Sequence, residues 1–88
     1  MVKYFVKKHC EATEVLNMAV GNIQDYYYGK TPLGGYVCKD REPKSFEGTL
    51  YGLGTRAEAE ELLAKMLPRA KAETAEGRWI TTLSIVEA

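Results

Sequence analysis

The sequence predicts an α+β fold in which one face of an antiparallel sheet is covered by helices. Segments near both ends of the chain, residues 2–9 and 79–86, have the composition and alternation of β-strands. Between them, residues 55–77 have the apolar spacing of an amphipathic helix with recognisable ends. The chain has 88 residues, 45% of them hydrophobic and 27% charged, which suits a single domain spanning residues 1–88.

In the first segment, residues 2–9, apolar residues recur at every second position. A period of two predicts a strand with one buried face. The two sides are Val2, Tyr4 and Val6 on one, and Lys3, Phe5, Lys7 and His9 on the other.

Residues 13–28 admit two interpretations. As a helix, the segment begins at Thr13 and ends at Gly29, with a stripe of Leu16, Val20, Ile23 and Tyr27. As a hairpin, Val15–Val20 and Ile23–Tyr28 are strands joined by a Gly-Asn turn. The turn residues and an internal asparagine weaken the helix by roughly 2 kcal/mol. Burial of the stripe exceeds that cost, so the helix is the favoured interpretation.

Two shorter strands are predicted next. Residues 30–35 and 40–45 carry the glycine, proline and aspartate of turns, and they flank a strand at Tyr36–Lys39. Phe46–Gly52 alternates again and predicts another strand. The β-branched and aromatic segment Trp79–Val86 is expected to form the last strand.

The helix at residues 55–77 has the clearest signals in the chain. Thr55 and Glu58 have the spacing of a capping box, and Gly77 is a typical terminator. Pro68 is expected to kink the helix because its ring crowds the preceding turn. The core-facing stripe is Ala59, Leu62, Leu63, Met66, Leu67 and Ala70.

The favoured order of elements is therefore strand, helix, strand, strand, helix, strand. This order is typical of the ferredoxin-like βαββαβ fold, a four-stranded antiparallel sheet with two helices on one face. If residues 13–28 form a hairpin instead, the fold becomes a five- or six-stranded antiparallel sheet packed on one long helix. Both alternatives leave one sheet face without a helix.

Composition and charge disfavour some classes of partner and location. Twelve basic and twelve acidic residues give a net charge of zero, which disfavours nucleic acid and anionic membranes as partners. No segment has the apolar length of a signal peptide or a membrane span, so a cytoplasmic protein is expected.

The residues that catalysis or metal binding would need are also missing. His9, Cys10 and Cys38 lack the spacing of a metal site or of a nucleophile with its base, so no cofactor, metal or enzymatic activity is expected. A Cys10–Cys38 disulfide is not expected either, because the two residues fall on nonadjacent strands.

Aromatic residues give the candidate binding sites. Tyr26, Tyr27 and Tyr28 are consecutive, so they cannot all face one core, and Lys30 follows them. The second candidate is the open sheet face, where Lys3, Phe5 and Lys7 are expected to lie beside Tyr51 or Phe46. Aromatic rings flanked by lysines on a sheet are a platform for single-stranded RNA.

Residues 44–51, KSFEGTLY, carry a resemblance to a known family. They resemble part of the RNA-recognition motif at Lys44, Phe46 and Tyr51, whereas Gly48 stands where that family usually has a stacking aromatic residue. The resemblance implies single-stranded RNA or DNA binding on the open sheet face.

The favoured function is a small non-enzymatic protein that binds another protein, as an inhibitor or adaptor of a larger complex. A virus-encoded antagonist of bacterial defence is one example of this class. A homodimer that buries the open sheet face is compatible with it. The alternative is a single-stranded nucleic-acid-binding module.

Overall fold

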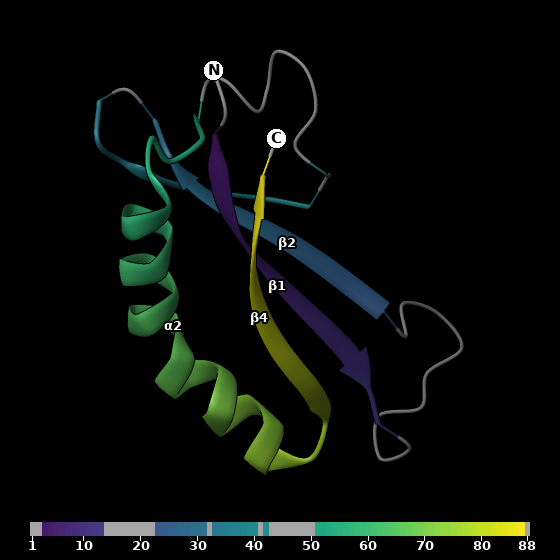
Figure 1. Ribbon diagram of the computed structural model, residues 1–88. Helices are drawn as coiled ribbons and strands as arrows, with labels where there is room; N and C mark the ends of the chain where they lie inside the picture. Colours follow the sequence, from purple (N-terminus) through teal and green to yellow (C-terminus); the bar gives the residue numbers. More distant parts are fainter. Residues whose placement is uncertain (1–2, 14–22, 32, 41, 43–50, 88) are drawn as a thin grey trace.

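The computed structural model describes residues 3–13, 23–31, 33–40, 42 and 51–87. These residues form four strands in one antiparallel sheet of order β3-β2-β1-β4, and one long helix lies against a face of that sheet (Figure 1). The α+β class and the four-stranded antiparallel sheet are confirmed. The elements are β1 (Tyr4–Ala12), β2 (Ile23–Lys30), β3 (Tyr36–Lys39), α2 (Arg56–Glu76) and β4 (Trp79–Glu87).

The favoured helix at residues 13–28 is wrong for its second half. Residues from Ile23 onward form β2, which pairs with β1 from Glu11↔Ile23 to Val6↔Tyr28 and with β3 on its other side. Consecutive tyrosines fit a pleated sheet better than a helix, and pairing on both sides supplies hydrogen bonds that the sequence pattern could not reveal. The hairpin interpretation is therefore right for Ile23–Tyr28, while Val15–Val20 lies outside the described residues.

The ferredoxin-like arrangement is not confirmed. β1 and β2 are antiparallel neighbours, whereas two strands joined by a crossover helix would run parallel. The described part of the chain has one helix, α2, on the sheet, which agrees with the single helix of the alternative fold. The alternative expected five or six strands, and four are described. Of the predicted strand Phe46–Gly52, the structure describes only the last two residues, and neither is in a strand.

α2 begins and ends as the sequence predicts. The hydroxyl of Thr55 accepts a hydrogen bond from the backbone N–H of Glu58 at 3.2 Å, and Gly77 ends the helix in the left-handed conformation with φ 85°. Pro68 lies inside the helix, which changes direction partway along its length (Figure 1). One expected core residue is wrong: Leu67 is 37% exposed.

The core lies between α2 and β1. Its fully and nearly buried members are Val6, Leu53, Ala59 and Leu62, and the side chains of Tyr4, Tyr28, Leu63, Met66, Leu83 and Ile85 pack around them. The alternation predicted for the first segment is confirmed over β1, since Val6 faces α2 while Phe5 faces the opposite side.

The face opposite α2 is not open at Phe5, which corrects the sequence-based expectation. The ring of Phe5 is fully buried and meets the ring of Tyr51 edge-on, with centroids 4.9 Å apart. Tyr51 is itself buried, and its backbone lies directly over Gly29 of β2. Tyr51 therefore covers this end of the face, a contact between distant parts of the sequence that residue periodicity does not encode.

The chain crosses from one face of the sheet to the other just after Tyr51. Leu53 exchanges two backbone hydrogen bonds with Tyr4, at 2.9 and 2.8 Å, in a single antiparallel bridge. Its side chain then joins the core beneath α2. Gly29 lies at the crossing, where a side chain would collide with the backbone of Tyr51.

The remaining features concern the cysteines and the membrane. Cys10 on β1 is buried and Cys38 on β3 is exposed; both are free thiols, and β2 lies between their strands. Among the described residues, no helix combines the length and the apolar character needed to cross a bilayer.

Candidate functional site

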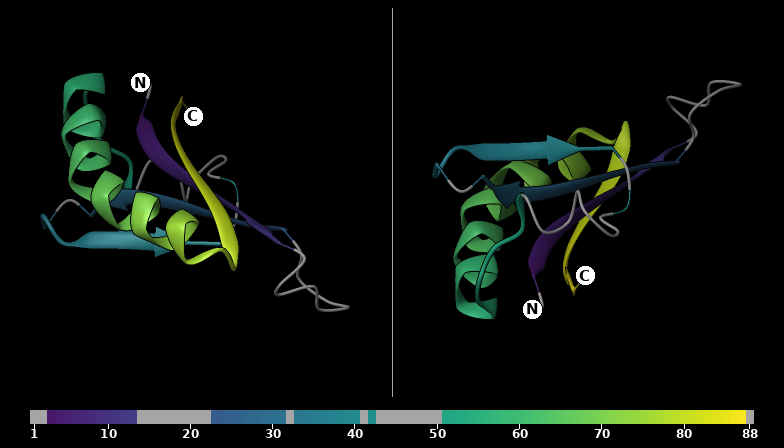
Figure 2. Two further views of the ribbon diagram at one scale, coloured as in Figure 1. Left: turned by 90° about the horizontal axis from the view of Figure 1, so that it is seen from below. Right: turned by 90° about the horizontal axis from the view of Figure 1, so that it is seen from above.

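The candidate site is a groove beside α2, because the helix packs on β4 and β1 and leaves the same face of β2 and β3 without a described element over it. The views along the sheet show α2 lying across one face, with β2 and β3 extending beyond it (Figure 2). The resulting cavity has a volume of about 240 Å³ and is lined by Lys8, Tyr28, Lys65, Met66, Arg69, Ala70 and Leu83. We call it the tyrosine groove.

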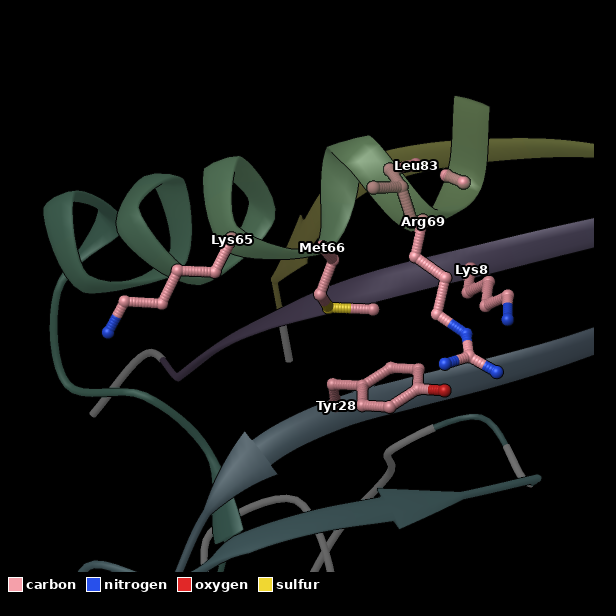
Figure 3. Close-up of a pocket in the computed structure, with 7 residues that line it drawn as sticks. Lys8, Tyr28, Lys65, Met66, Arg69 and Leu83 are labelled. Atoms are coloured by element: carbon pink, nitrogen blue, oxygen red, sulfur yellow. The ribbon is translucent and has the colours of Figure 1, made fainter. Parts of the chain in front are cut away.

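One wall of the tyrosine groove is a flank of α2. Lys65, Met66 and Arg69 lie on this flank because residues three or four apart share one side of a helix. Figure 3 shows Met66 and Arg69 pointing from the helix toward β2, with the guanidinium group of Arg69 beside the hydroxyl end of Tyr28. The side chain of Arg69 is 87% exposed, so its charge is available to a ligand.

The floor of the groove is formed by alternate residues of β2. Tyr26 and Tyr28 face α2, because Tyr28 pairs with the core residue Val6 and Tyr26 pairs with Lys8. Burial raises the pKa of the Tyr28 hydroxyl far above its ordinary value, and a hydrogen bond with Cys38 adds to the shift. Tyr28 therefore stays protonated and can act as a hydrogen-bond donor at any physiological pH.

A network of charged and hydroxyl groups fixes the inner end of the groove. The Nζ atom of Lys8 lies 3.0 Å from the Oε1 atom of Glu73, and the hydroxyl of Thr81 donates to Glu73 Oε2 at 3.0 Å. Desolvation alone would raise the pKa of the Glu73 carboxyl, but the hydrogen bonds from Lys8 and Thr81 outweigh it and the pKa is lowered. Arg69 Nε also lies 3.4 Å from Glu73 Oε1. The network ties β1 and β4 to α2.

The groove continues past this network toward the start of β4. A second cavity shares Lys8 and Arg69 with the first and is also lined by Cys10, Gln24, Tyr26, Glu73, Glu76 and Trp79. The hydroxyl of Tyr26 donates to the side-chain oxygen of Gln24 at 2.6 Å, which holds the ring along the strand. The whole surface therefore combines aromatic rings with cations from two elements.

The strand β3 extends the same face. By register, Cys38 lies beside Tyr28 and Tyr36 lies beside Lys30, so all four side chains belong to the face that α2 partly covers. The Nζ atom of Lys30 is 5.0 Å from the centre of the Tyr36 ring, within the range of a cation–π contact. Lys30 thus adds another cation near the aromatic floor, besides Lys8, Lys65 and Arg69.

The structure divides the eight binding residues predicted from the sequence between two faces. Tyr26, Tyr28 and Lys30 lie on the groove face. Tyr27 faces the opposite side, where it is buried and the Nζ atom of Lys7 lies 5.8 Å from its ring centre. The others, Lys3, Phe5 and Tyr51, are half-buried, fully buried and buried respectively.

Sequence reasoning missed the helix side of the groove. Lys65 and Arg69 are four residues apart and lie on either side of Met66 in the sequence. Charged residues of this kind normally border the apolar stripe of an amphipathic helix and face solvent. The spacing could have suggested a basic flank on the helix. Only the position of α2 over β1 and β4 turns that flank into the wall of a groove.

The opposite face carries a second polar cluster. His9 lies between two carboxylates, with Nδ1 2.5 Å from Asp25 Oδ1 and Nε2 3.0 Å from Glu11 Oε1. Both hydrogen bonds favour the imidazolium form, that with Glu11 most strongly, so the pKa of His9 is raised. The ring nitrogens are thereby both engaged, and neither is available to take a proton from a substrate.

Within the described residues, no group of three or more acidic, histidine or cysteine side chains is placed to hold a metal ion. Comparison with known protein families, with curated proteins and with solved structures finds no significant match to this chain. The tyrosine groove is therefore the feature of this chain that bears on its function.

Proposed function

We propose that this chain is a small non-enzymatic module that acts by binding another protein through the tyrosine groove. The observation that supports the proposal is the half of the sheet face over which no described element lies, where Tyr26 and Tyr28 form a floor beside a helix flank carrying Lys65, Met66 and Arg69. Tyrosine, arginine and methionine are the residue types enriched at protein interfaces.

The charges indicate the chemistry of the partner segment. Arg69 and Lys65 on α2 and Lys30 on β2 surround the aromatic floor, while Glu73 is held by Lys8 and Thr81 and by the Nε atom of the exposed Arg69 side chain at 3.4 Å. A segment that presents an apolar side chain with a neighbouring carboxylate matches this pattern, because the ring and thioether surfaces take the former and Arg69 takes the latter.

A protein partner fits better than single-stranded RNA. The aromatic residues expected to stack bases, Phe5 and Tyr51, are buried against each other. Farther along the same sheet face, beside His9, lie the acidic side chains of Glu11 and Asp25. The net charge of zero supplies no long-range attraction for a polyanion.

A charge reversal in the groove tests the proposal. We expect Arg69→Glu to lose the partners that the wild-type protein captures from extracts of its native host, because the change repels the carboxylate that Arg69 would bind. The matched control is Arg56→Glu, which changes an exposed arginine on the same helix that is likewise paired with a glutamate four residues later. Retention of every partner by Arg69→Glu would contradict the proposal.

Salt dependence separates the two classes of partner. We expect no binding of single-stranded RNA or DNA by the wild-type protein in fluorescence anisotropy, even at low salt. Measurable affinity that falls steeply as salt rises would instead favour the nucleic-acid alternative, because release of counterions from phosphates gives that signature.

A further inference from the structure

The second edge of the sheet offers an independent interaction surface. β4 is the last strand in the order β3-β2-β1-β4, so its outer side faces no strand within the described part of the chain. It runs over nine residues, Trp79–Glu87, and forms one rim of the molecule (Figure 2). An unpaired edge of this length is a template for strand addition.

The hydrogen bonds of the structure show which backbone groups face outward. The N–H of Thr81 donates to Thr74 Oγ1 at 3.1 Å, and its C=O accepts from the same hydroxyl at 3.3 Å, so both groups of Thr81 point away from β1. The N–H and C=O groups of Tyr4 are both hydrogen-bonded to Leu53 and therefore do not bond β4. Its partner on β4, Glu87, thus makes no backbone hydrogen bond to Tyr4, and the backbone groups of Glu87 also point away from β1. Backbone N–H and C=O groups point alternately toward and away from the neighbouring strand along an antiparallel pair. The backbone groups of Leu83 and Ile85 therefore also point away from β1.

The usual devices that protect an edge strand are missing from this segment. Residues 83–87, LSIVE, contain no proline and no lysine, and their one charged residue is the terminal Glu87. β4 pairs with β1 without interruption from Trp79 to Glu87, so no bulge bends the edge away. Among the outward backbone groups of β4, the hydrogen bonds of the described residues block those of Thr81, through the side chain of Thr74.

An apolar groove lies beside this edge. Its volume is about 390 Å³, and Leu67, Ala70 and Lys71 of α2 line it together with Thr81 and Leu83 of β4, as do Thr74 and Thr82. Leu67 is the stripe residue that α2 leaves exposed. The helix flank and the strand edge therefore present apolar surface and free hydrogen-bonding groups side by side.

We propose that this edge binds a second copy of the chain, by antiparallel pairing of the two β4 strands about Ile85. In this register Ile85 faces its own counterpart and Leu83 faces Glu87, so every outward backbone group from Leu83 to Glu87 is paired while Thr81 stays capped. On the face away from α2, Ser84 lies opposite Val86. The dimer is an eight-stranded sheet with both helices on one face.

The occupant is a second copy because the pairing is self-complementary. No like charges oppose each other, since each Glu87 faces an uncharged Leu83, the other cross-strand pairs join apolar or small side chains, and the net charge of zero adds no repulsion between copies. Leu83 lines the inner side of the tyrosine groove, but its floor on β2 lies toward the other edge of the sheet, so dimerisation leaves it accessible. The inference does not depend on the proposed function.

Sedimentation velocity of the full chain tests the dimer. We expect the wild-type protein to sediment at twice the chain mass at high micromolar concentration. The double change Ser84→Lys with Val86→Lys should give a monomer with an unchanged circular dichroism spectrum, because it sets like charges opposite each other in both copies. The control is Thr82→Lys, at an exposed position on the same face of β4 but outside the paired segment, and it should remain dimeric.

A cysteine cross-link tests the register. In a Cys38→Ser background, oxidation of Ile85→Cys is expected to give a covalent dimer, because directly opposed residues have Cα atoms close enough for a disulfide. Ser84→Cys should give none. A monomeric wild-type protein, a dimeric double variant, or a cross-link through Ser84→Cys in place of Ile85→Cys would overturn the inference.

Discussion

The absent side chain of Gly29 is what allows the chain to cross the sheet. A Cβ atom built there would lie 2.0 Å from the carbonyl oxygen of Tyr51, a distance that no side-chain rearrangement can relieve because the obstacle is backbone. The sequence pattern gave Gly29 a different role, as the end of a helix. Its actual role depends on a residue 22 positions later in the chain.

We therefore expect Gly29→Ala to lower the free energy of unfolding by at least about 2 kcal/mol, as overpacking against a rigid neighbour does. Urea denaturation followed by circular dichroism measures the change. Gly35→Ala is the control, because the nearest atom to its added Cβ is 3.7 Å away. Equal stability of the two variants would show that the backbone of Tyr51 does not lie over Gly29.

His9 gives a titration that can be followed at a single site, since it is the only histidine in the chain. Its hydrogen bonds with Glu11 and Asp25 raise its pKa above the ordinary value of 6.5. The resulting stabilisation is present below pH 6.5 and is lost as the pH rises through the raised pKa of the folded state. We expect NMR titration to show this raised pKa in the wild-type protein.

The matched variants are Asp25→Asn and Glu60→Gln. The first removes one hydrogen-bonded carboxylate and should lower the pKa of His9, while the second alters a carboxylate on the outer side of α2 and should leave it unchanged. A wild-type pKa at or below 6.5 would contradict the geometry of the cluster.

At the scale of elements, Glu73 joins the helix to two strands. Its carboxylate accepts hydrogen bonds from Lys8 of β1 and Thr81 of β4, and Thr81 lies 3.8 Å from the sulfur of Cys10. Partly buried charged hydrogen bonds of this kind stabilise a fold by more than surface ion pairs do.

We expect Glu73→Gln to lower the free energy of unfolding by about 1–2 kcal/mol at neutral pH, because it leaves Lys8 without its counter-charge. The difference from wild type should vanish as the pH falls through the lowered pKa of Glu73, since stabilisation by a depressed carboxyl pKa is lost on protonation. Chemical denaturation at neutral and acidic pH measures both effects. The exposed Glu76→Gln is the control, and a loss equal to that of Glu73→Gln would argue against the network.

Some elements were predictable because their signals are local. The capping box at Thr55, the terminator Gly77 and the β-rich segment from Trp79 act over a few residues, and α2, β3 and β4 follow the expected bounds closely. The prediction for residues 23–30 was wrong because the apolar spacing there fits both a helix and a strand. The choice between them was made by pairing with β1 and β3, which are partners at a distance.

At the scale of the whole molecule, the two thiols report on folding. Cys38 is exposed on β3 and Cys10 is buried between β1 and α2. We expect one thiol equivalent to react quickly with a thiol reagent in the native protein and the second only on unfolding or opening. Mass spectrometry of the modified peptides identifies each site, and rapid modification of Cys10 would contradict the packing of α2 on β1.

The sequence by itself determined the α+β class, the ends of the long helix, the shorter strand at Tyr36–Lys39 and the final strand, because caps, periodicity and turn residues act locally. The tertiary structure decided the rest. Which strands are neighbours, where the chain crosses at Gly29, and that α2 covers only half of one sheet face all depend on contacts between distant residues. The tyrosine groove exists because α2 covers only half of that face, and its walls come from two elements that lie far apart in the sequence.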